Sequence, residues 1–523
     1  MNRLSNLNAS SPACLNRRSA LKLLGGVSLA ATTQFIPSFA IAAEPKRGGT
    51  IKIGVSGGST SDSLDPTTYL DSHMYVIGFA LGNNLVEIGP DRKPIPELAE
   101  SWQSSDGAKH WEFKLRKGVT FHNGRPLTAA DVVYSLNRHI GEDSKSAAKG
   151  FLNGVSSIHT EGDRVIIDHE SGDADIPIIM GDFHLQIIPE GHTDWTTFVG
   201  TGPYILEEFE PGVSFKASRN PNYWKKDRAW VDSVEVLYIT DATARTSALL
   251  SGGVDIIDRV DNKTVKRLQD LNRYNLIEGL GGRYETTVMD VRNSPFNDAN
   301  VRLALKYAVN RQEIVDRVFQ GFAALGNDHP IPPADPFYHS ELPQRPYDTD
   351  KAAWHLKQAG LDSLTLDLSA ADAAFPGAVD AAVLMKESAR TAGIEINVRQ
   401  EPNDGYWSNV WMKKPYVMSN WSTRPTPGMM FSVAFACGAP WAEAYWCNNQ
   451  FEKLMTAGKT ETDFVRRKQI YWDMQEIIHN DGGNGIFAFP SDLDAYDRSI
   501  QGTIADGVNR LMGARVIERV WKA

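Results

Sequence analysis

Apolar residues alternate with polar ones in several short stretches of this chain. Residues 50–55 read Thr-Ile-Lys-Ile-Gly-Val, with isoleucine at every second position of the first four. Residues 111–115 (Trp-Glu-Phe-Lys-Leu) alternate in the same way, and residues 231–239 are similarly rich in valine. Side chains of a strand point to opposite faces in turn, so this spacing predicts a β-strand in each stretch.

Other stretches carry apolar residues at helical spacing and end in glycine. Residues 378–392 form such a stretch, Gly393 follows it, and 394–398 (Ile-Glu-Ile-Asn-Val) alternates as a strand. Residues 243–250 likewise predict a helix before two glycines and a short strand at 254–257. The repeated order of helix, glycine and strand predicts α/β architecture.

Three helix starts carry capping residues. Thr128-Ala129-Ala130-Asp131 resembles a capping box ahead of apolar residues at helical spacing, and Asn310-Arg311-Gln312-Glu313 has a similar pattern. Asp298 stands where it can cap a helix that continues to Ala308. These signals place further helices between the predicted strands.

Residues 1–43 have the pattern of an export signal. Arg17 and Arg18 precede an apolar, small-residue run over 21–43, which ends in an Ala-x-Ala cleavage pattern. The paired arginines resemble a twin-arginine (Tat) signal, so we expect export by that route with cleavage near Ala42. The mature protein would then be soluble and periplasmic. An uncleaved membrane anchor is the alternative, although glycine and proline interrupt the run.

Composition narrows the function further. The chain has 523 residues, 42% of them hydrophobic, which is too long for one core and suits two or three domains. The net charge is −10, and it becomes −14 without the four basic residues of the leader, so nucleic-acid binding is not expected. After cleavage only Cys437 and Cys447 remain, and in an oxidising compartment they can form one disulfide. Two cysteines alone are too few for a metal site.

Several motifs follow one another along the chain. They are RGGTIKIG at 47–54, IPELAESW through VVYSLNRH at 95–139, GTGPYILEEFEPG at 200–212, LLSGGVDII at 249–257 and FNDANVRLALKYAVNRQEIV at 296–315. Together, and in this order, they resemble the extracytoplasmic solute-binding proteins of ABC importers, family 5, the peptide/nickel class. The resemblance covers essentially the whole mature chain.

The resemblance implies a two-lobed periplasmic-binding-protein (Venus-flytrap) fold of the α/β class with an extra third domain in lobe I. Lobe I would comprise 44–87, 200–285 and 491–523, with 88–199 as the extra domain. Lobe II would be 286–490, and the crossovers near 285 and 490 would be hinges. Closure would bury a solute between the lobes.

One position departs from the family pattern. In peptide-binding members, a tryptophan of lobe II is followed three residues later by an aspartate that pairs with the ligand's α-ammonium. Here Trp421 matches the tryptophan, but Arg424 replaces the aspartate. An ammonium would be repelled there, whereas a carboxylate or phosphate could pair with the guanidinium. Two alternatives are a local slip of the alignment and an Arg424 that bonds backbone carbonyls.

The remaining site candidates are aromatic or lie on loops expected near the cleft. The predicted ligand-binding residues besides Arg424 and Trp421 are Tyr69, Asn327, Asp328, His329, Tyr406, Trp407 and Phe487. Aromatic rings offer a solute area and stacking. The polar trio at 327–329 could hydrogen-bond a solute or could cap the turn before Pro330.

Enzyme interpretations fit less well. Gly54 to Gly58 matches G-x-S-x-G around Ser56, but a nucleophile elbow needs a helix directly after the serine, and the sequence there predicts a loop. Motifs for zinc hydrolases, redox dithiols and nucleotide-binding loops are absent from the sequence. No catalytic residue, metal site or cofactor is therefore predicted.

The sequence thus predicts a periplasmic receptor that captures a peptide or peptide-like organic solute, with an anionic group facing Arg424. Its partners would be the solute and, transiently, the permease and ATPase subunits of an importer; the receptor itself would be a monomer. A nickel chelate or haem in the same scaffold is the alternative, and a secreted serine hydrolase is a more distant one.

Overall fold

The computed structural model describes residues 44–279 and 281–523, and 45–523 form one compact unit. The predicted Tat signal at 1–43 lies outside the described residues. Among the residues described, no helix combines the length and the apolar character that crossing a bilayer requires. The described chain contains three larger sheets, each with its own hydrophobic cluster.

The first sheet has seven strands and is assembled from distant parts of the chain. Its order is β12 (Tyr274–Gly279), β19 (Asp492–Asp497), β11 (Ile256–Ile257), β1 (Thr50–Val55), β10 (Ser233–Tyr238), β9 (Ser214–Arg219) and β8 (Tyr204–Glu210). The strand expected at 50–55 is β1, which runs parallel to both β10 and β11 at the centre of the sheet. The side chains of Ile51 and Ile53 are fully buried there, as the alternation predicts.

Helices and a small hairpin accompany this sheet. They are α1 (Ser72–Leu81), α4 (Ala242–Ser251), α5 (Asn262–Asp270), α14 (Arg510–Gly513), α15 (Val516–Arg519), a 3₁₀ turn (Pro66–Thr68), and β20 (Ile500–Gln501) paired with β21 (Trp521–Lys522). Helix α4 ends where Gly252 adopts φ 76°, a left-handed conformation that glycine takes without steric strain.

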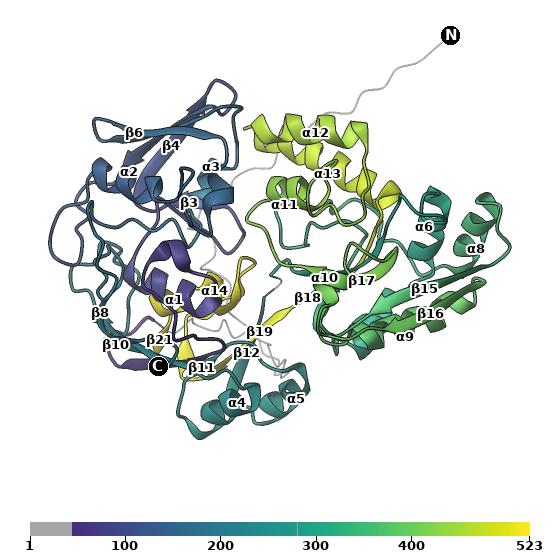
Figure 1. Ribbon diagram of the computed structural model, residues 1–523. Helices are drawn as coiled ribbons and strands as arrows, with labels where there is room; N and C mark the ends of the chain where they lie inside the picture. Colours follow the sequence, from purple (N-terminus) through teal and green to yellow (C-terminus); the bar gives the residue numbers. More distant parts are fainter. Residues whose placement is uncertain (1–43, 280) are drawn as a thin grey trace, which may run out of the picture. The chain divides into compact units, whose positions relative to one another are not determined.

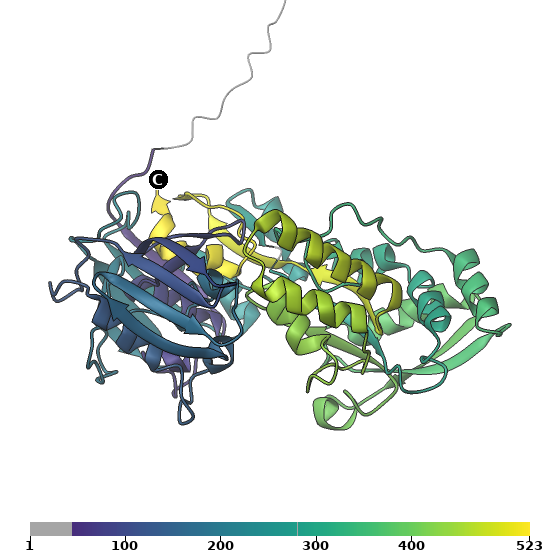
Figure 2. The ribbon, with the colours of Figure 1, turned by 90° about the horizontal axis from the view of Figure 1, so that it is seen from above.

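The second sheet has four antiparallel strands. Their order is β4 (Ala99–Ser105), β5 (His110–Leu115), β7 (Arg164–His169) and β6 (Val155–Glu161). Figure 2 shows these strands in blue. Associated elements are β2 (Val86–Ile88), β3 (Pro94–Pro96), α2 (Ala129–Asn137), α3 (Ile176–Ile179) and a 3₁₀ turn (Lys149–Leu152). Helix α2 begins with the capping box of Thr128 and Asp131 that the sequence predicts.

The third sheet has six strands, all from the segment 284–490. Its order is β14 (Ala323–Leu325), β18 (Asn484–Pro490), β13 (Tyr284–Met289), β17 (Tyr416–Trp421), β15 (Leu364–Ala370) and β16 (Ile394–Gln400). Its helices are α6 (Ala299–Tyr307), α7 (Arg311–Arg317), α8 (Thr349–Gln358), α9 (Ala378–Arg390), α10 (Tyr406–Asn409), α11 (Pro427–Ala434), α12 (Asn449–Thr460) and α13 (Phe464–Asp481). Figure 1 shows α9 against β16 and α6 beside α8, and both pairs are in contact.

The chain passes twice between the first and third sheets. Strand β12 ends at Gly279 and β13 begins at Tyr284; later, β18 ends at Pro490 and β19 begins at Asp492. These short connections lie where the sequence analysis expects hinges, and β13 starts two residues before the lobe boundary proposed at 286. The boundaries of the lobes themselves stay a prediction.

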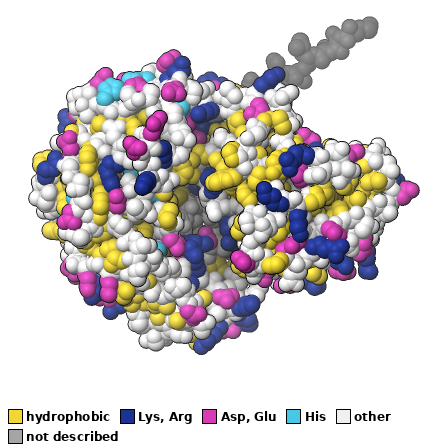
Figure 3. Space-filling model, in the orientation of Figure 1, with side chains coloured by type: hydrophobic (Ala, Val, Ile, Leu, Met, Phe, Trp, Pro, Cys, Tyr) yellow, Lys and Arg dark blue, Asp and Glu magenta, His cyan; other side chains and the backbone are white. Residues whose placement is uncertain are grey.

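Acidic and basic side chains are interspersed over the face drawn in Figure 3, with hydrophobic side chains between them. A more uneven arrangement of charge occurs inside the structure, in a cavity bordered by several arginines.

Candidate functional site: an arginine-bordered cavity

A cavity of about 710 Å³ is lined by residues of the first sheet's helices, of the four-stranded sheet's domain and of the segment after β17. This volume lies in the range of small-molecule sites. Its apolar lining includes Tyr75, Phe79, Ile88, Phe151, Ile178, Phe183, Met429, Val433, Trp441 and Val508. The rings of Tyr75 and Phe183 stack on each other, so part of this wall is a preformed aromatic surface. Such a wall suits the organic body of a solute.

Arg424 lies in the lining of this cavity and is half-buried. Its guanidinium donates to the carbonyls of Ser422 (3.2 Å) and Thr423 (3.4 Å) and lies over the ring of Trp421, 5.4 Å from the centroid. Among the described residues no carboxylate pairs with it. Burial lowers the pKa of Arg424, which expresses the cost of desolvating its charge. The carbonyl contacts expected as an alternative therefore exist, and they leave the charge uncompensated.

Trp421 supports Arg424 from below and is itself outside the lining of the cavity. Only 6% of its surface is exposed, and its indole N–H donates to Glu443 Oε1 at 2.9 Å. Glu443 is buried and also accepts hydrogen bonds from Trp411, Ser419 and Asn484. This carboxylate fixes the ring on which Arg424 rests, and no local sequence signal pointed to it.

Four further arginines line the cavity, and sequence reasoning missed all of them. Arg92 faces Asp335 at 3.2 Å, Arg510 pairs with Asp492, and Arg515 donates to Glu97 at 2.9 Å. The fourth, Arg283, has its Nε 3.3 Å from Glu285. Their partners are distant in sequence except for Glu285, so local patterns could not identify them.

Three predicted aromatic ligands have internal packing roles in the structure, which corrects their assignment to the cavity. Tyr69 is fully buried and its hydroxyl donates to the Leu64 carbonyl at 3.1 Å. Tyr406 is buried, with its hydroxyl bonded to the Met418 carbonyl at 2.7 Å. Phe487 is buried in β18, with its ring centroid 6.0 Å from that of Phe375.

Trp407 is also placed differently from its prediction. It is 42% exposed at the start of the short helix α10 and does not line the cavity. Its ring packs edge-on against Tyr406 and Trp411. The cluster of tryptophans in this part of the sequence therefore divides between surface, core and cavity, and Trp441 is the member that borders the cavity.

The polar trio 327–329 is an internal anchor and lies outside the cavity lining, a second correction. Asp328 is fully buried between Arg311 and Arg345, each 2.7 Å from one of its oxygens. The two arginines hold the pKa of Asp328 well below its usual range despite burial. Asn327 donates to the Pro343 carbonyl, and His329 is fully buried. Both oxygens of Asp328 are thus engaged by arginines inside the fold, and the carboxylate is not available to a solute in the cavity.

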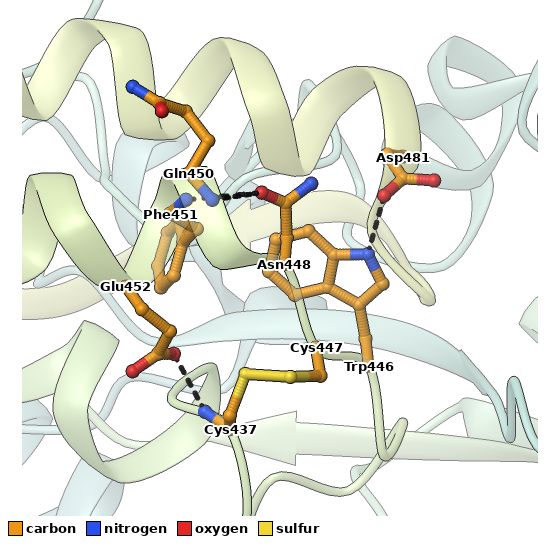
Figure 4. Close-up of a disulfide and its surroundings, with 8 residues drawn as sticks. All are labelled: Cys437, Trp446, Cys447, Asn448, Gln450, Phe451, Glu452 and Asp481. Atoms are coloured by element: carbon orange, nitrogen blue, oxygen red, sulfur yellow. Dashed lines mark hydrogen bonds between the residues drawn. A yellow bond between two sulfur atoms is a disulfide. The ribbon is translucent and has the colours of Figure 1, made fainter.

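Cys437 and Cys447 form a disulfide (Figure 4). The Cys437 amide donates to Glu452 of α12, and the neighbouring Trp446 donates to Asp481 of α13. The closed loop contains both Trp441 of the cavity and the carboxylate of Glu443. The bond thus constrains a segment that contributes to the cavity and supports Trp421.

The geometry around Ser56 and around the one acidic cluster favours structural roles. Ser56 is buried, and its hydroxyl donates to Asp258 at 3.0 Å. Among the described residues, Glu87, Glu97 and Glu518 form the one group spaced for a metal ion, but Lys225 contacts all three at 2.7–2.9 Å. A lysine ammonium already occupies the place where a cation would compensate their charge.

Comparison with known proteins gives a consistent family. The sequence model of the bacterial extracellular solute-binding proteins, family 5, matches residues 93–443. Di/tripeptide-binding protein 1 of Pseudomonas aeruginosa is 26% identical over 427 residues, covering 74% of this chain and 79% of that protein. Heme-binding protein A of Haemophilus influenzae is 29% identical over 450 residues, covering 76% and 79%.

A solved structure resembles the fold. HbpA2 from Haemophilus parasuis superposes with a TM-score of 0.82 at 21% identity, covering 91% of this chain and all of that one. The likeness confirms the predicted α/β periplasmic-binding-protein fold.

Proposed function

Because the chain belongs to family 5 of the bacterial extracellular solute-binding proteins, we propose that it is the solute-binding component of an ABC importer and captures a peptide or peptide-like organic solute. The single observation that carries the choice of solute is the cavity, whose apolar wall is bordered by an Arg424 without a carboxylate partner among the described residues. An organic solute with an anionic group fits both features. The dipeptide-binding names of several relatives support the peptide-like class.

The remaining features of the proposal concern the protein's cellular setting. The protein is exported by the twin-arginine route, acts in the periplasm as a monomer, and docks transiently on permease and ATPase subunits. Lobe I comprises 44–87, 200–285 and 491–523, the extra domain 88–199, and lobe II 286–490. The bound solute leaves unchanged, because the role is capture and delivery, without a catalytic step. Ligand affinity would shift the lobes toward the closed arrangement.

Native mass spectrometry of the exported, purified protein tests this proposal. The expected result is a retained small organic molecule, or a thermal shift with acidic peptides, since a ligand that binds only the folded state raises its stability. Metal analysis of the same sample distinguishes the alternative of a nickel chelate or haem in this scaffold. A protein that retains no molecule and responds to no peptide in the thermal screen would contradict the peptide assignment.

A further inference from the structure

We infer that the cavity recognises an apolar solute with two acidic groups, one of which Arg283 binds and the other Arg424. The inference rests on the proposed function and deepens it, because it specifies the solute as an organic dianion without a free ammonium group.

The two arginines emerge from the same end of the third sheet. Strands β13 and β17 are antiparallel neighbours, with Tyr284 opposite Trp421. Arg283 directly precedes β13 and Arg424 follows β17. Because the two strands are antiparallel, both arginines lie beyond the same end of the sheet. The Thr423 hydroxyl donates to the Gly281 carbonyl and ties the two connecting segments together. Both side chains then border the same cavity.

The other arginines of the cavity differ from these two in their partners. Arg92, Arg510 and Arg515 each contact an acidic side chain that is itself at most 22% exposed. Arg424 contacts two backbone carbonyls and an aromatic ring, and no acidic group among the described residues. A cation held by neutral dipoles in a partly desolvated site favours the arrival of an anion.

Arg283 has an acidic neighbour, Glu285, whose neutral, protonated form is favoured by burial. Glu285 is fully buried, its Oε1 lies 3.3 Å from Arg283 Nε, and neither of its oxygens accepts a well-oriented hydrogen bond from the described residues. Burial raises the pKa of Glu285 to about 8, although Arg283 opposes this shift. With the proton on Glu285, the side chain of Arg283, which is 39% exposed, keeps its positive charge available to the cavity.

The lining contains two acidic residues, Asp182 and Asp492, beside its five arginines, so positive charge prevails in the cavity. Asp492 pairs with Arg510. Asp182 accepts hydrogen bonds from both the backbone and the ring of His184 through Oδ1, at 3.0 and 2.6 Å. Among the acidic residues of the lining, Asp182 is the one that could attract an ammonium group, so a zwitterionic peptide is a necessary comparison.

Calorimetric titration with three matched peptides tests the inference: Leu-Leu, N-acetyl-Leu-Leu and N-succinyl-Leu-Leu. All three contain the same apolar Leu-Leu body. Leu-Leu carries an ammonium and a carboxylate, the acetyl peptide carries one carboxylate, and the succinyl peptide carries two. The titrations use the wild type, Arg283→Gln and Arg424→Gln. The control is Arg399→Gln, which removes an exposed arginine of β16 that pairs with Asp367 of β15. Melting temperatures of all four proteins check folding.

The expected result is that N-succinyl-Leu-Leu binds most tightly, with Leu-Leu the weakest. Arg283→Gln and Arg424→Gln should each weaken binding of the succinyl peptide by about 10- to 100-fold, since each removes a charge-assisted hydrogen bond. Arg283→Gln should affect the acetyl peptide much less, and Arg399→Gln should change neither affinity. Identification of a co-purified solute with two acidic groups by native mass spectrometry would support the same conclusion.

Several results would overturn the inference. Equal affinity for the acetyl and succinyl peptides, or tightest binding of Leu-Leu, would refute the dianion while leaving the proposed peptide receptor intact. Arg283→Gln that binds the succinyl peptide like the wild type would remove Arg283 from the site. Failure of all three peptides to bind, together with the absence of any co-purified solute, would refute both this inference and the proposed function.

Discussion

At the residue scale, the carboxylate of Glu443 organises the aromatic support of the cavity. Four neutral donors converge on it, including the indoles of Trp411 and Trp421. Burial raises the pKa of Glu443, while the four hydrogen bonds oppose the shift. Glu443→Ala leaves the donors unsatisfied, so we expect a loss of about 2–4 kcal/mol in the free energy of unfolding, measured by urea denaturation. Ligand affinity should also fall, because Trp421 loses the contact that fixes its ring beneath Arg424.

Two further variants separate this role from a general effect of charge removal. Glu443→Gln keeps one acceptor oxygen and should retain part of the lost stability. Glu395→Gln removes a half-exposed carboxylate on β16, 3.9 Å from Lys386, and should change stability by less than about 0.5 kcal/mol. If Glu443→Ala were as stable as Glu395→Gln, the converging hydrogen bonds would not stabilise the fold.

Glu285 predicts a specific dependence of stability on pH. Its pKa rises from 4.5 to about 8 on folding, chiefly through burial, so the folded protein binds a proton that the unfolded chain has released between these values. The free energy of folding contributed by this residue is complete below pH 4.5. It is lost progressively as the pH rises to about 8, at up to about 1.4 kcal/mol per pH unit. Relative to the wild type, Glu285→Gln should therefore become more stable between pH 5 and 8. Urea denaturation of both proteins at several pH values measures this, and parallel curves would contradict it.

Sequence reasoning located some of these residues and missed others for a physical reason. Arg424 was found because it replaces an aspartate at a family position, and the structure places it at the cavity. Asp328 was misassigned because its partners, Arg311 and Arg345, are each 17 residues away and produce no local pattern. Glu443 and Arg283 gave no sequence signal, since their roles depend on strands that meet only in the folded chain.

At the scale of elements, local patterns identified helices and strands well. The helix expected at 378–392 is α9 (Ala378–Arg390), and the strand expected at 394–398 begins β16 at Ile394. Between them Gly393 has φ 79°, the left-handed conformation that permits the sharp helix end. Strand order could not be read in this way, because β1 pairs with β10 across about 180 residues of sequence and the pairing is fixed by tertiary packing.

The disulfide constrains the loop between α11 and α12. The two cysteines are 10 residues apart in sequence, and their bond restricts the unfolded chain. Replacing both by serine should therefore lower the free energy of unfolding by about 2–3 kcal/mol. Ligand affinity should fall as well, because Trp441 in this loop lines the cavity. Calorimetry and urea denaturation measure the two effects. Dithiothreitol should reproduce them in the wild type and have no effect on the double variant; equal sensitivity of both proteins would contradict the assignment.

At the scale of the whole molecule, a buried ion pair joins the domain of the four-stranded sheet to a helix beside the third sheet. Asp175, at the start of α3, lies 2.7 Å from Arg467 of α13 and accepts a hydrogen bond from Thr426 at 2.5 Å. Both charged side chains are at most 6% exposed. Neither Asp175 nor Arg467 lines the cavity, and Thr426, which bonds Asp175, lies two residues after Arg424. In the proposed receptor, this contact would favour the arrangement in which a solute is enclosed.

Breaking this pair should weaken ligand binding without removing any contact to the ligand. If only the enclosing arrangement binds tightly, a lower population of that arrangement reduces the observed affinity in proportion. Asp175→Asn should thus weaken binding by about tenfold, which corresponds to about 1.4 kcal/mol. Arg467→Gln should have a similar effect, and the double variant should be no weaker than either single one, because the two residues act through one interaction. Arg466→Gln is the matched control: the adjacent arginine is exposed and pairs with Glu461 at 2.8 Å outside this junction. Additive losses in the double variant, or an equal loss in Arg466→Gln, would show that the ion pair does not control enclosure.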